Sequence, residues 1–313
     1  MKKKVLKRTR LAGRRSLRHV REFAKLTSPG ASAAKFLDSL PDVLAARALR
    51  DLAAAVVRAR RAKRPVVFAF GAHVIKCGLA PVVIDLMKRG FITSLATHGA
   101  SAIHDYEFAA AGHSSEDVAA GLAKGTYGMT RDTAAAIGEA AWQAVEKGCG
   151  LGRAVGDLIR QQKCKHRKTS IFAEAARLDI PCTVHVAIGT DTVHMHPEVD
   201  CGVLGAASQR DFEIVTEVVS KLNRGVWLNV GSAVILPEVF LKAVALNRSR
   251  RVKLDDVTTA DLDMIRHYRP GVNVLGRPAK RSFAITGHHE IMLPLLRVAV
   301  LKAQKGKGGK TRA

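Results

Sequence analysis

Six short apolar runs separated by helical patterns dominate the middle of this chain of 313 residues. The runs lie at residues 65–70, 92–97, 182–188, 226–230, 252–260 and 282–286. Helical patterns fill the intervals, for example at residues 79–89, 130–147, 209–222 and 237–246. Strands that are apolar on both faces and alternate with helices are typical of a parallel sheet covered on both sides. The sequence therefore predicts a doubly wound α/β domain with a mostly parallel sheet.

The positive charge is concentrated in a few segments. The formal net charge is +24; residues 1–25 hold eleven Lys or Arg and one Glu, and residues 299–313 hold five basic residues and no acid. The runs 47–64 and 160–168 carry the remaining excess. Because the rest of the chain is close to neutral, a nucleic-acid-binding surface over the whole molecule is disfavoured. Nonspecific contact with RNA or another polyanion through the basic tails stays open.

We expect three regions along the chain. Residues 1–30 form a basic N-terminal arm that ends at the turn-forming Ser28-Pro29-Gly30, residues 31–302 form a single α/β domain, and residues 303–313 form a basic low-complexity tail. Within the domain, residues 47–64 predict an amphipathic helix whose apolar side includes Leu49 and Leu52 and whose basic side is solvated.

The five cysteines indicate a reducing compartment. Their number is odd and no CxxC pair occurs, which argues against a disulfide framework and against a cysteine-rich zinc site. No apolar segment of signal-peptide length follows the charged N-terminus, and no window has the roughly 18 apolar residues of a membrane span. We expect a cytoplasmic protein without membrane contact.

Turns that contain glycine and polar residues follow five of the six apolar runs. Ligands of doubly wound sheets bind beyond the carboxyl ends of the strands. Glycine permits close backbone approach there, and helix N-termini attract anions. Glycine is also common in such turns without any ligand, and no GxGxxG follows the first run, so these turns alone do not specify a dinucleotide.

These turns resemble those of the deoxyhypusine synthase family, which has a Rossmann-like NAD-binding fold. Matching segments occur in the same order between about residues 66 and 301: GAHVIKCGLAPVVIDLMKRG, THGASAIHD, AIGTD, GSAVILPE, Thr259-Ala260 and ITGHHEIMLPLL. The resemblance implies NAD as cofactor and a homo-oligomer, a tetramer in that family. It implies cofactor contacts at Gly71, Ala72, His73, Gly78, His98, Gly99, Ala100, Ser101, Gly189, Thr190, Gly231, Ser232, Thr259 and Gly287.

The chain departs from the family at its catalytic lysine. That lysine lies in a WGK sequence, which does not occur here; ungapped alignment places Leu275 at the position, and Lys280 is nearby. Covalent amine chemistry requires an activated lysine. We therefore expect a related fold with altered chemistry, and not genuine deoxyhypusine formation on a protein lysine.

Histidines and acids at the strand ends are the candidate catalytic groups. We assign catalytic roles to His288, His194, His196, Glu238 and Asp191. Imidazoles can transfer protons near neutral pH or bind a divalent metal, and His288 could join His194 and His196 from a neighbouring strand end. Helix capping or packing is the alternative role, and a metal site is possible but not favoured.

A second acidic group is a candidate for substrate binding. We assign substrate binding to Asp105, Glu107, His289 and Glu290. Carboxylates here would bind a cationic substrate such as a polyamine, or would only stabilise the start of a helix.

Three functions remain open. The first is an NAD-dependent enzyme that dehydrogenates a small amine or transfers part of it. The second is a non-catalytic nucleotide-binding or scaffold protein with RNA-binding basic tails. The third is a metal-dependent hydrolase built on the histidine cluster.

Overall fold

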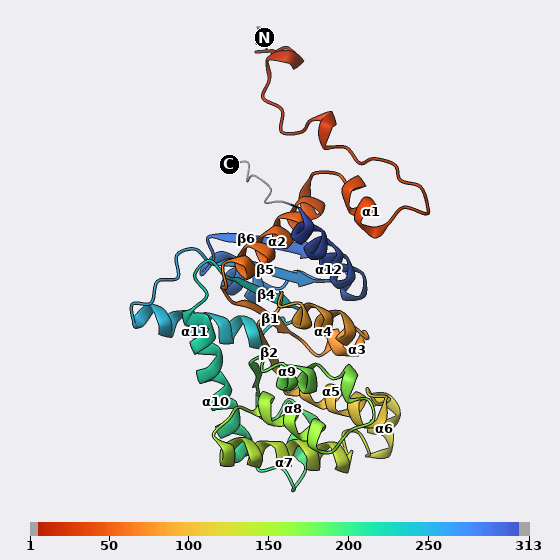
Figure 1. The fold of residues 1–313 in the computed structure, drawn as a ribbon, viewed down its shortest axis with the longest axis vertical. Helices are drawn as coiled ribbons and strands as arrows, with labels where there is room; N and C mark the ends of the chain where they lie inside the picture. Colours follow the sequence, from red (N-terminus) through yellow and green to blue (C-terminus); the bar gives the residue numbers. More distant parts are fainter. Residues whose placement is uncertain (1–5, 307–313) are drawn as a thin grey trace, which may run out of the picture.

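The computed structural model describes residues 6–306, in which a six-stranded sheet lies between helices (Figure 1). The strands are β1 (Val66–Phe70), β2 (Ser94–His98), β3 (Cys182–His185), β4 (Val226–Val230), β5 (Thr258–Asp263) and β6 (Arg281–Thr286). Their order is β3-β2-β1-β4-β5-β6, and every neighbouring pair is parallel. This is the strand order of Rossmann-like domains, so the predicted fold class is confirmed.

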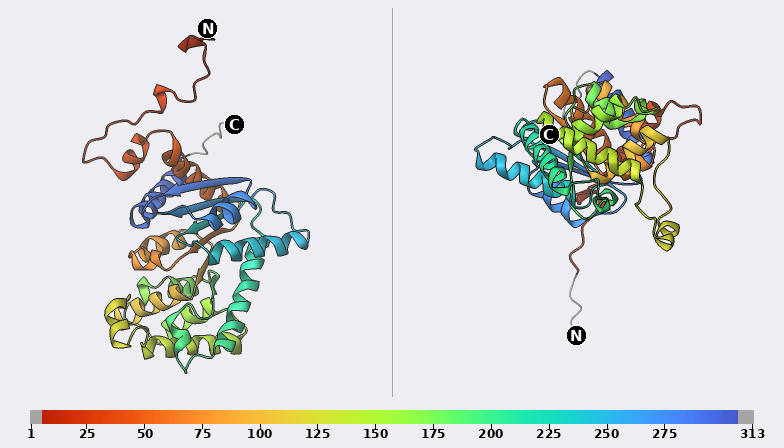
Figure 2. Two further views of the ribbon diagram at one scale, coloured as in Figure 1. Left: turned by 180° about the vertical axis from the view of Figure 1, so that it is seen from behind. Right: turned by 90° about the horizontal axis from the view of Figure 1, so that it is seen from below.

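Helices cover both faces of the sheet. One face packs against α2 (Leu44–Arg61), α4 (Ala80–Lys88), α5 (Gly99–Ala111), α8 (Leu151–Gln161), α9 (Ile171–Arg177) and α12 (His289–Lys305). The other face packs against α10 (Cys201–Ser220) and α11 (Ile235–Ser249), and Figure 2 shows these two helices on the far side of the sheet from α2 and α12. The remaining α-helices are α1 (Ala33–Ser39), α3 (His73–Lys76), α6 (Val118–Lys124) and α7 (Arg131–Lys147). Short turns of helix lie at η1 (Leu11–Gly13), η2 (Val20–Glu22), η3 (Arg167–Thr169), η4 (Thr192–Met195) and η5 (Pro270–Gly276).

Alternating side chains of the central strands β1, β2 and β4 fill two separate cores. In β1, Val66, Phe68 and Phe70 lie in one core, while Val67 and Ala69 lie in the other. All five residues are buried because helices cover both faces of the sheet. This explains why the strand reads as a continuous apolar run in the sequence.

Two strands differ from their predicted bounds by more than two residues. The run 182–188 forms a strand only as far as His185, and the glycine-containing turn begins earlier than expected. The run 252–260 is irregular as far as residue 257, and β5 starts at Thr258 and continues to Asp263. The strand β5 does not read as a continuous apolar run in the sequence because it contains two aspartates. The buried Asp261 is accommodated by Asn229 Nδ2 at 2.8 Å and by Arg266 Nη1 at 3.2 Å.

The N-terminal arm leaves the body at the end where β6 lies (Figure 1). It is held near its base: Glu22 accepts a hydrogen bond from Arg47 of α2 at 2.9 Å, and the Lys25 N–H donates to the Ser39 carbonyl at 2.8 Å. Residues 1–5 of the predicted arm and 307–313 of the predicted tail lie outside the described residues. In residues 6–306, no helix combines the length and the apolar character needed to cross a bilayer.

Asp211 connects three elements beside the sheet. It lies on α10 and is fully buried, and its Oδ2 accepts N–H bonds from Gly152 of α8 at 3.0 Å and Val184 of β3 at 2.8 Å. Burial raises the pKa of Asp211 to about 7, although these backbone donors oppose the rise.

We expect Asp211→Asn to change how stability depends on pH. The folded pKa of about 7 exceeds the unfolded value of about 3.9, so the folded state binds the extra proton between these values. The contribution of Asp211 to the free energy of unfolding therefore falls as the pH rises from about 4 to about 7. Asparagine does not titrate, so the variant should lack this decline, worth up to about 4 kcal/mol. Urea unfolding across this range measures it, and parallel pH profiles for the two proteins would contradict the expectation.

Candidate functional site

The strand order reverses between β1 and β4, where doubly wound sheets bind their ligands. Gly71 follows β1 and Gly231 follows β4. A Cβ atom on Gly71 would clash with the Gly231 carbonyl oxygen. Gly231 has a φ of 64°, and a Cβ atom there would lie 2.5 Å from Nε2 of His289. Both turns therefore require glycine because the protein itself packs against them.

Beyond these glycines, several backbone N–H groups have no acceptor within residues 6–306. They belong to Ala72 and His73 after β1 and to Ser232 and Ala233 after β4. The N-cap residue of α11, Val234, makes no side-chain capping bond. Free N–H groups at the starts of helices bind anions. The switch point thus has N–H donors without acceptors on two adjacent strand ends, which favour an anion.

Burial lowers the pKa of three histidines at this edge, His98, His185 and His289. Burial, together with the nearby His104, lowers the pKa of His98 to about 4, and burial with His98 lowers that of His185 to about 3. His289 is also buried; its ring lies 5.8 Å from the ring of His73, and its Nδ1 has no partner in the described residues. Burial lowers the pKa of His289 as well. These imidazoles offer hydrogen bonds, not positive charge.

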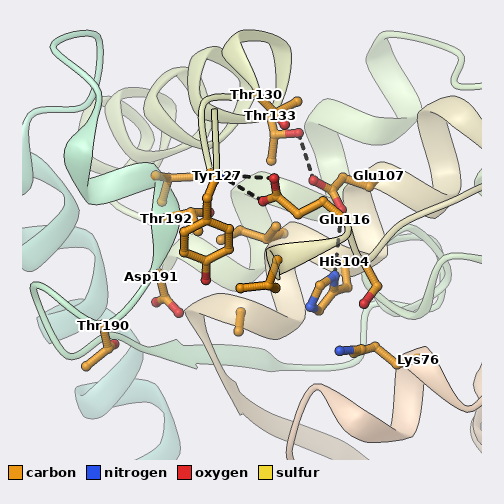
Figure 3. Close-up of a pocket in the computed structure, with 16 residues that line it drawn as sticks. Lys76, His104, Glu107, Glu116, Tyr127, Thr130, Thr133, Thr190, Asp191 and Thr192 are labelled. Atoms are coloured by element: carbon orange, nitrogen blue, oxygen red, sulfur yellow. Dashed lines mark hydrogen bonds and ion pairs between the residues drawn. The ribbon is translucent and has the colours of Figure 1, made fainter. Parts of the chain in front are cut away.

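A cavity of about 190 Å³ lies at the same edge, over the half of the sheet that contains β1, β2 and β3. In Figure 3, Lys76, His104, Tyr127 and Asp191 project toward a common space. The lining comes from α3, α5, the α6 region, the start of α7 and η4. It contains Lys76, Ala100, Ile103, His104, Glu107, Ser115, Glu116, Val118, Tyr127, Gly128, Thr130, Thr133, Thr190, Asp191, Thr192 and Val193. Three carboxylates and one lysine therefore share a small volume.

Asp191 occupies the N-terminus of α5. Its carboxylate accepts the N–H of Ala100, and a Cβ atom on Gly99 would clash with it. Burial raises the pKa of Asp191, although the charges of His194 and His104 and the Ala100 bond oppose the rise. A carboxylate with a raised pKa accepts a proton more readily than an exposed aspartate does.

Glu107 and Glu116 are held by their neighbours. Glu107 accepts hydrogen bonds from Ser114 at 2.5 Å and Thr133 at 3.1 Å. Burial raises the pKa of Glu107, but bonds from His104, Ser114 and Thr133 outweigh it and lower the pKa overall. Both oxygens of Glu116 accept the Gly128 N–H, at 3.0 and 3.1 Å. Glu107 is therefore ionised at neutral pH, which suits a cationic ligand.

The histidines after β3 make local contacts. Nδ1 of His194 accepts N–H bonds from Gly189 at 3.0 Å and Asp191 at 3.3 Å. Nε2 of His196 lies 2.7 Å from the Gly128 carbonyl oxygen. The expectation that His288 joins them from a neighbouring strand end is wrong, because β3 and β6 lie at opposite sides of the sheet.

His288, Glu290 and Glu238 lie apart from the cavity lining. The side chains of His288 and Glu290 are largely exposed beside one another at the start of α12. Glu238 of α11 forms ion pairs with Lys242 and with Arg269, the latter at 3.1 Å. The hydrogen bond from Lys242, together with Arg269, outweighs the effect of partial burial and lowers the pKa of Glu238.

Two predicted binding residues occupy structural positions. Asp105 is fully buried, and its carboxylate accepts bonds from Ser170 and from the N–H groups of Ile171 and Phe172 at the start of α9. It therefore caps a helix and does not face the cavity. Thr259 is the second residue of β5 and is buried far from the carboxyl edge. The shifted bounds of β5 explain this misplacement.

Of the other predicted cofactor residues, some have structural contacts and some face open space or the cavity. Ser101 is buried and bonded to Thr97 at 2.6 Å, and the Ser232 hydroxyl accepts the Leu236 N–H at 3.2 Å. Gly78 and Gly189 adopt positive φ with open space around them. Gly287 packs against Met292. Ala100 and Thr190 line the cavity.

Lys76, Glu116, Tyr127 and Thr130 line the cavity but are not among the residues predicted from the sequence. Lys76 is the last residue of the short helix α3 after the first strand, outside any WGK sequence. The others come from a loop around α6 whose signal was its glycines between two helical patterns, at Gly121, Gly125 and Gly128. Within residues 6–306, no three or more His, Cys, Asp or Glu side chains are grouped in a way that could hold a metal ion.

No protein-family model and no curated protein matches this chain. Solved structures do match. The arginine dihydrolase ArgZ of the cyanobacterial ornithine-ammonia cycle has a TM-score of 0.50 and 17% identity over 80% of this chain and 32% of its own. AgrE, in a ternary complex with ornithine and NAD+, has a TM-score of 0.51 and 17% identity over 82% of this chain and 33% of its own.

A third match covers nearly the whole of both chains. A protein provisionally assigned as a deoxyhypusine synthase from Entamoeba histolytica has a TM-score of 0.50 and 10% identity over 90% of this chain and 97% of its own. This chain spans about a third of the length of ArgZ and AgrE. At such identities the matches show a shared Rossmann-like fold, which agrees with the fold expected from the resemblance.

We expect Gly99→Ala to destabilise the protein by about 2–3 kcal/mol, because the new methyl group would displace the Asp191 carboxylate from the start of α5. Urea unfolding measures the loss. Gly205→Ala is the matched control: it lies inside α10 with open space around it, and we expect it to be neutral or stabilising. Wild-type stability in the Gly99 variant would show that Asp191 is not held there.

Proposed function

We propose that this protein is an NAD-linked enzyme that dehydrogenates a small amine or transfers part of it. The observation that carries the proposal is the cavity in which Glu107, Glu116 and Asp191 face Lys76 at the carboxyl edge, beside the switch point of the sheet. The ornithine and NAD+ bound by AgrE support it, since that protein shares the fold. The absence of a WGK lysine argues against deoxyhypusine formation on a protein lysine.

The switch point is the proposed cofactor site. The free N–H groups of Ala72, His73, Ser232 and Ala233 would hold the pyrophosphate, in place of the absent GxGxxG turn. NAD, when bound, would accept a hydride from the substrate. The buried His289 lies beside Gly231 and has an Nδ1 without a partner in the described residues.

The cavity is the proposed amine site. Glu107 and Glu116 would pair with an ammonium group, and Lys76 would pair with a carboxylate if the substrate is an amino acid. Amine oxidation requires the nitrogen to lose a proton. Asp191 is the base we assign, since burial raises its pKa and it lines the cavity.

We expect NAD+ to bind the wild-type protein in isothermal titration calorimetry, and Ala233→Asp to weaken binding by at least tenfold. The new carboxylate would compete for the free N–H groups and repel the pyrophosphate. Ala120→Asp, at an exposed position on α6, is the control and should bind like the wild type. An absence of heat and of any thermal shift at millimolar NAD+ would contradict the cofactor assignment.

We expect Glu107→Gln to weaken binding of a basic amine about tenfold or more, because it removes a charge-assisted hydrogen bond. Ornithine, arginine, putrescine and spermidine are the probes, tested by calorimetry with and without NAD+. Glu146→Gln removes the same charge from the exposed surface of α7 and is the control. Equal affinities in the two variants would place the amine elsewhere.

A further inference from the structure

The edge of the sheet opposite the cavity is lined with basic residues. Each of the six strands is entered by a segment that carries Lys or Arg. In sheet order from β3 to β6 these residues are Arg177; Lys88 and Arg89; Lys63 and Arg64; Arg224; Arg250, Arg251 and Lys253; and Lys280 with Arg281. Neighbouring strands lie about 4.8 Å apart, so the row extends over about 24 Å.

Backbone contacts hold these turns side by side. The Val226 N–H donates to the Pro65 carbonyl at 3.0 Å, which joins the entries to β4 and β1. The Arg224 N–H donates to the Asp256 carbonyl at 2.7 Å, and the Lys280 N–H donates to the Val257 carbonyl at 3.1 Å. The row of cations is thus part of a rigid surface.

Many of these cations have no internal counter-ion. Within residues 6–306, no carboxylate lies within 4.0 Å of the cationic groups of Lys63, Arg64, Arg224, Arg250, Arg251 and Lys253, which enter β1, β4 and β5. The other cations of the row are paired: Lys88 and Arg177 with Glu174, Arg89 with Asp85, and Lys280 and Arg281 with Asp256. Arg58, Arg224 and Arg281 line one cavity of about 160 Å³, whose single lining carboxylate is Asp256. Burial, with the charge of Arg281, lowers the pKa of Arg58. Near the entries to β2 and β3, a second cavity of about 390 Å³ is lined by Lys88, Arg160, Arg167, Lys168, Ala173, Glu174 and Arg177.

Three of the cations occupy backbone positions that favour glycine. Lys63, Arg224 and Arg251 have φ values of 51°, 67° and 61° and enter the adjacent strands β1, β4 and β5. A residue with a Cβ atom is less stable than glycine in this conformation. At the same edge, Gly90 before β2 and Asp179 before β3 also adopt it. Before β1, β4 and β5 the residue in this conformation is a cation.

We propose that this amino-terminal edge of the sheet binds the phosphate backbone of a nucleic acid. The unpaired guanidinium and ammonium groups at the adjacent entries to β1, β4 and β5 match a chain of phosphates. None of the large exposed hydrophobic side chains lies in these entry segments, and the one aromatic residue, Phe91, is buried beneath Arg60. The surface thus offers nothing to insert into a membrane or to stack on bases, so recognition is independent of base sequence.

The test replaces Lys63, Arg224 and Arg251 together by glycine. These substitutions remove three charges and relieve the backbone, so the melting temperature should not fall. Fluorescence anisotropy with a labelled single-stranded RNA of about 30 nucleotides should show binding at least tenfold weaker at physiological salt. The slope of log affinity against log salt should be smaller by about 2.

Two variants of equal charge provide the controls. Lys124→Gln, Arg131→Gln and Lys147→Gln remove three charges from α6 and α7, and Arg14→Gln, Arg15→Gln and Arg18→Gln remove three from the arm. Each should reduce affinity less than the glycine variant does. If the glycine variant melts lower, Arg58→Gln with Arg281→Gln tests the same edge. Wild-type affinity in the edge variants, equal losses in the controls, or binding to phosphatidylserine vesicles without binding to RNA would overturn the proposal.

Discussion

The common direction of all six strands is the constraint on which the chemistry of this protein depends. Parallel strands place every carboxyl end at one edge and every amino end at the other. Helices that follow the strands therefore begin at the first edge, and helices that precede them end at the second. Because helix dipoles are positive at N-termini and negative at C-termini, the first edge favours anions and the second favours cations.

The helix N-termini at the carboxyl edge differ in how their N–H groups are paired. Asp191 satisfies the start of α5, whereas the N–H groups after β1 and β4 stay free. The close approach of Gly71 and Gly231 brings these two turns together at the switch point. His98 and His289 lie beside these turns, and burial lowers the pKa of both; at His289 it outweighs the effect of Asp263 and Glu290. The edge is thus suited to an anionic cofactor and a cationic substrate in neighbouring spaces.

Some of this could be predicted from the chain alone and some could not. The run 226–230 matches β4 residue for residue, because a buried parallel strand needs apolar side chains on both faces. The predicted bounds of β5 were wrong, because the pairing of the buried Asp261 with Asn229 and Arg266 depends on the tertiary structure. Glu107, a predicted binding residue, lines the cavity, but Asp105, two residues before it on the same helix, caps α9, because residues i and i+2 of a helix point in different directions.

The amino-acid sequence by itself determined the fold class, the strand-end glycines and the segments that carry charge, because hydrophobic periodicity and composition are local properties. The tertiary structure alone decided which polar groups meet. It separated His288 from His194 by the width of the sheet, brought Lys76 and Glu116 to one cavity, and aligned cations from six distant segments along one edge. Strand order and helix packing set these distances, and the spacing of residues along the chain predicts neither of them.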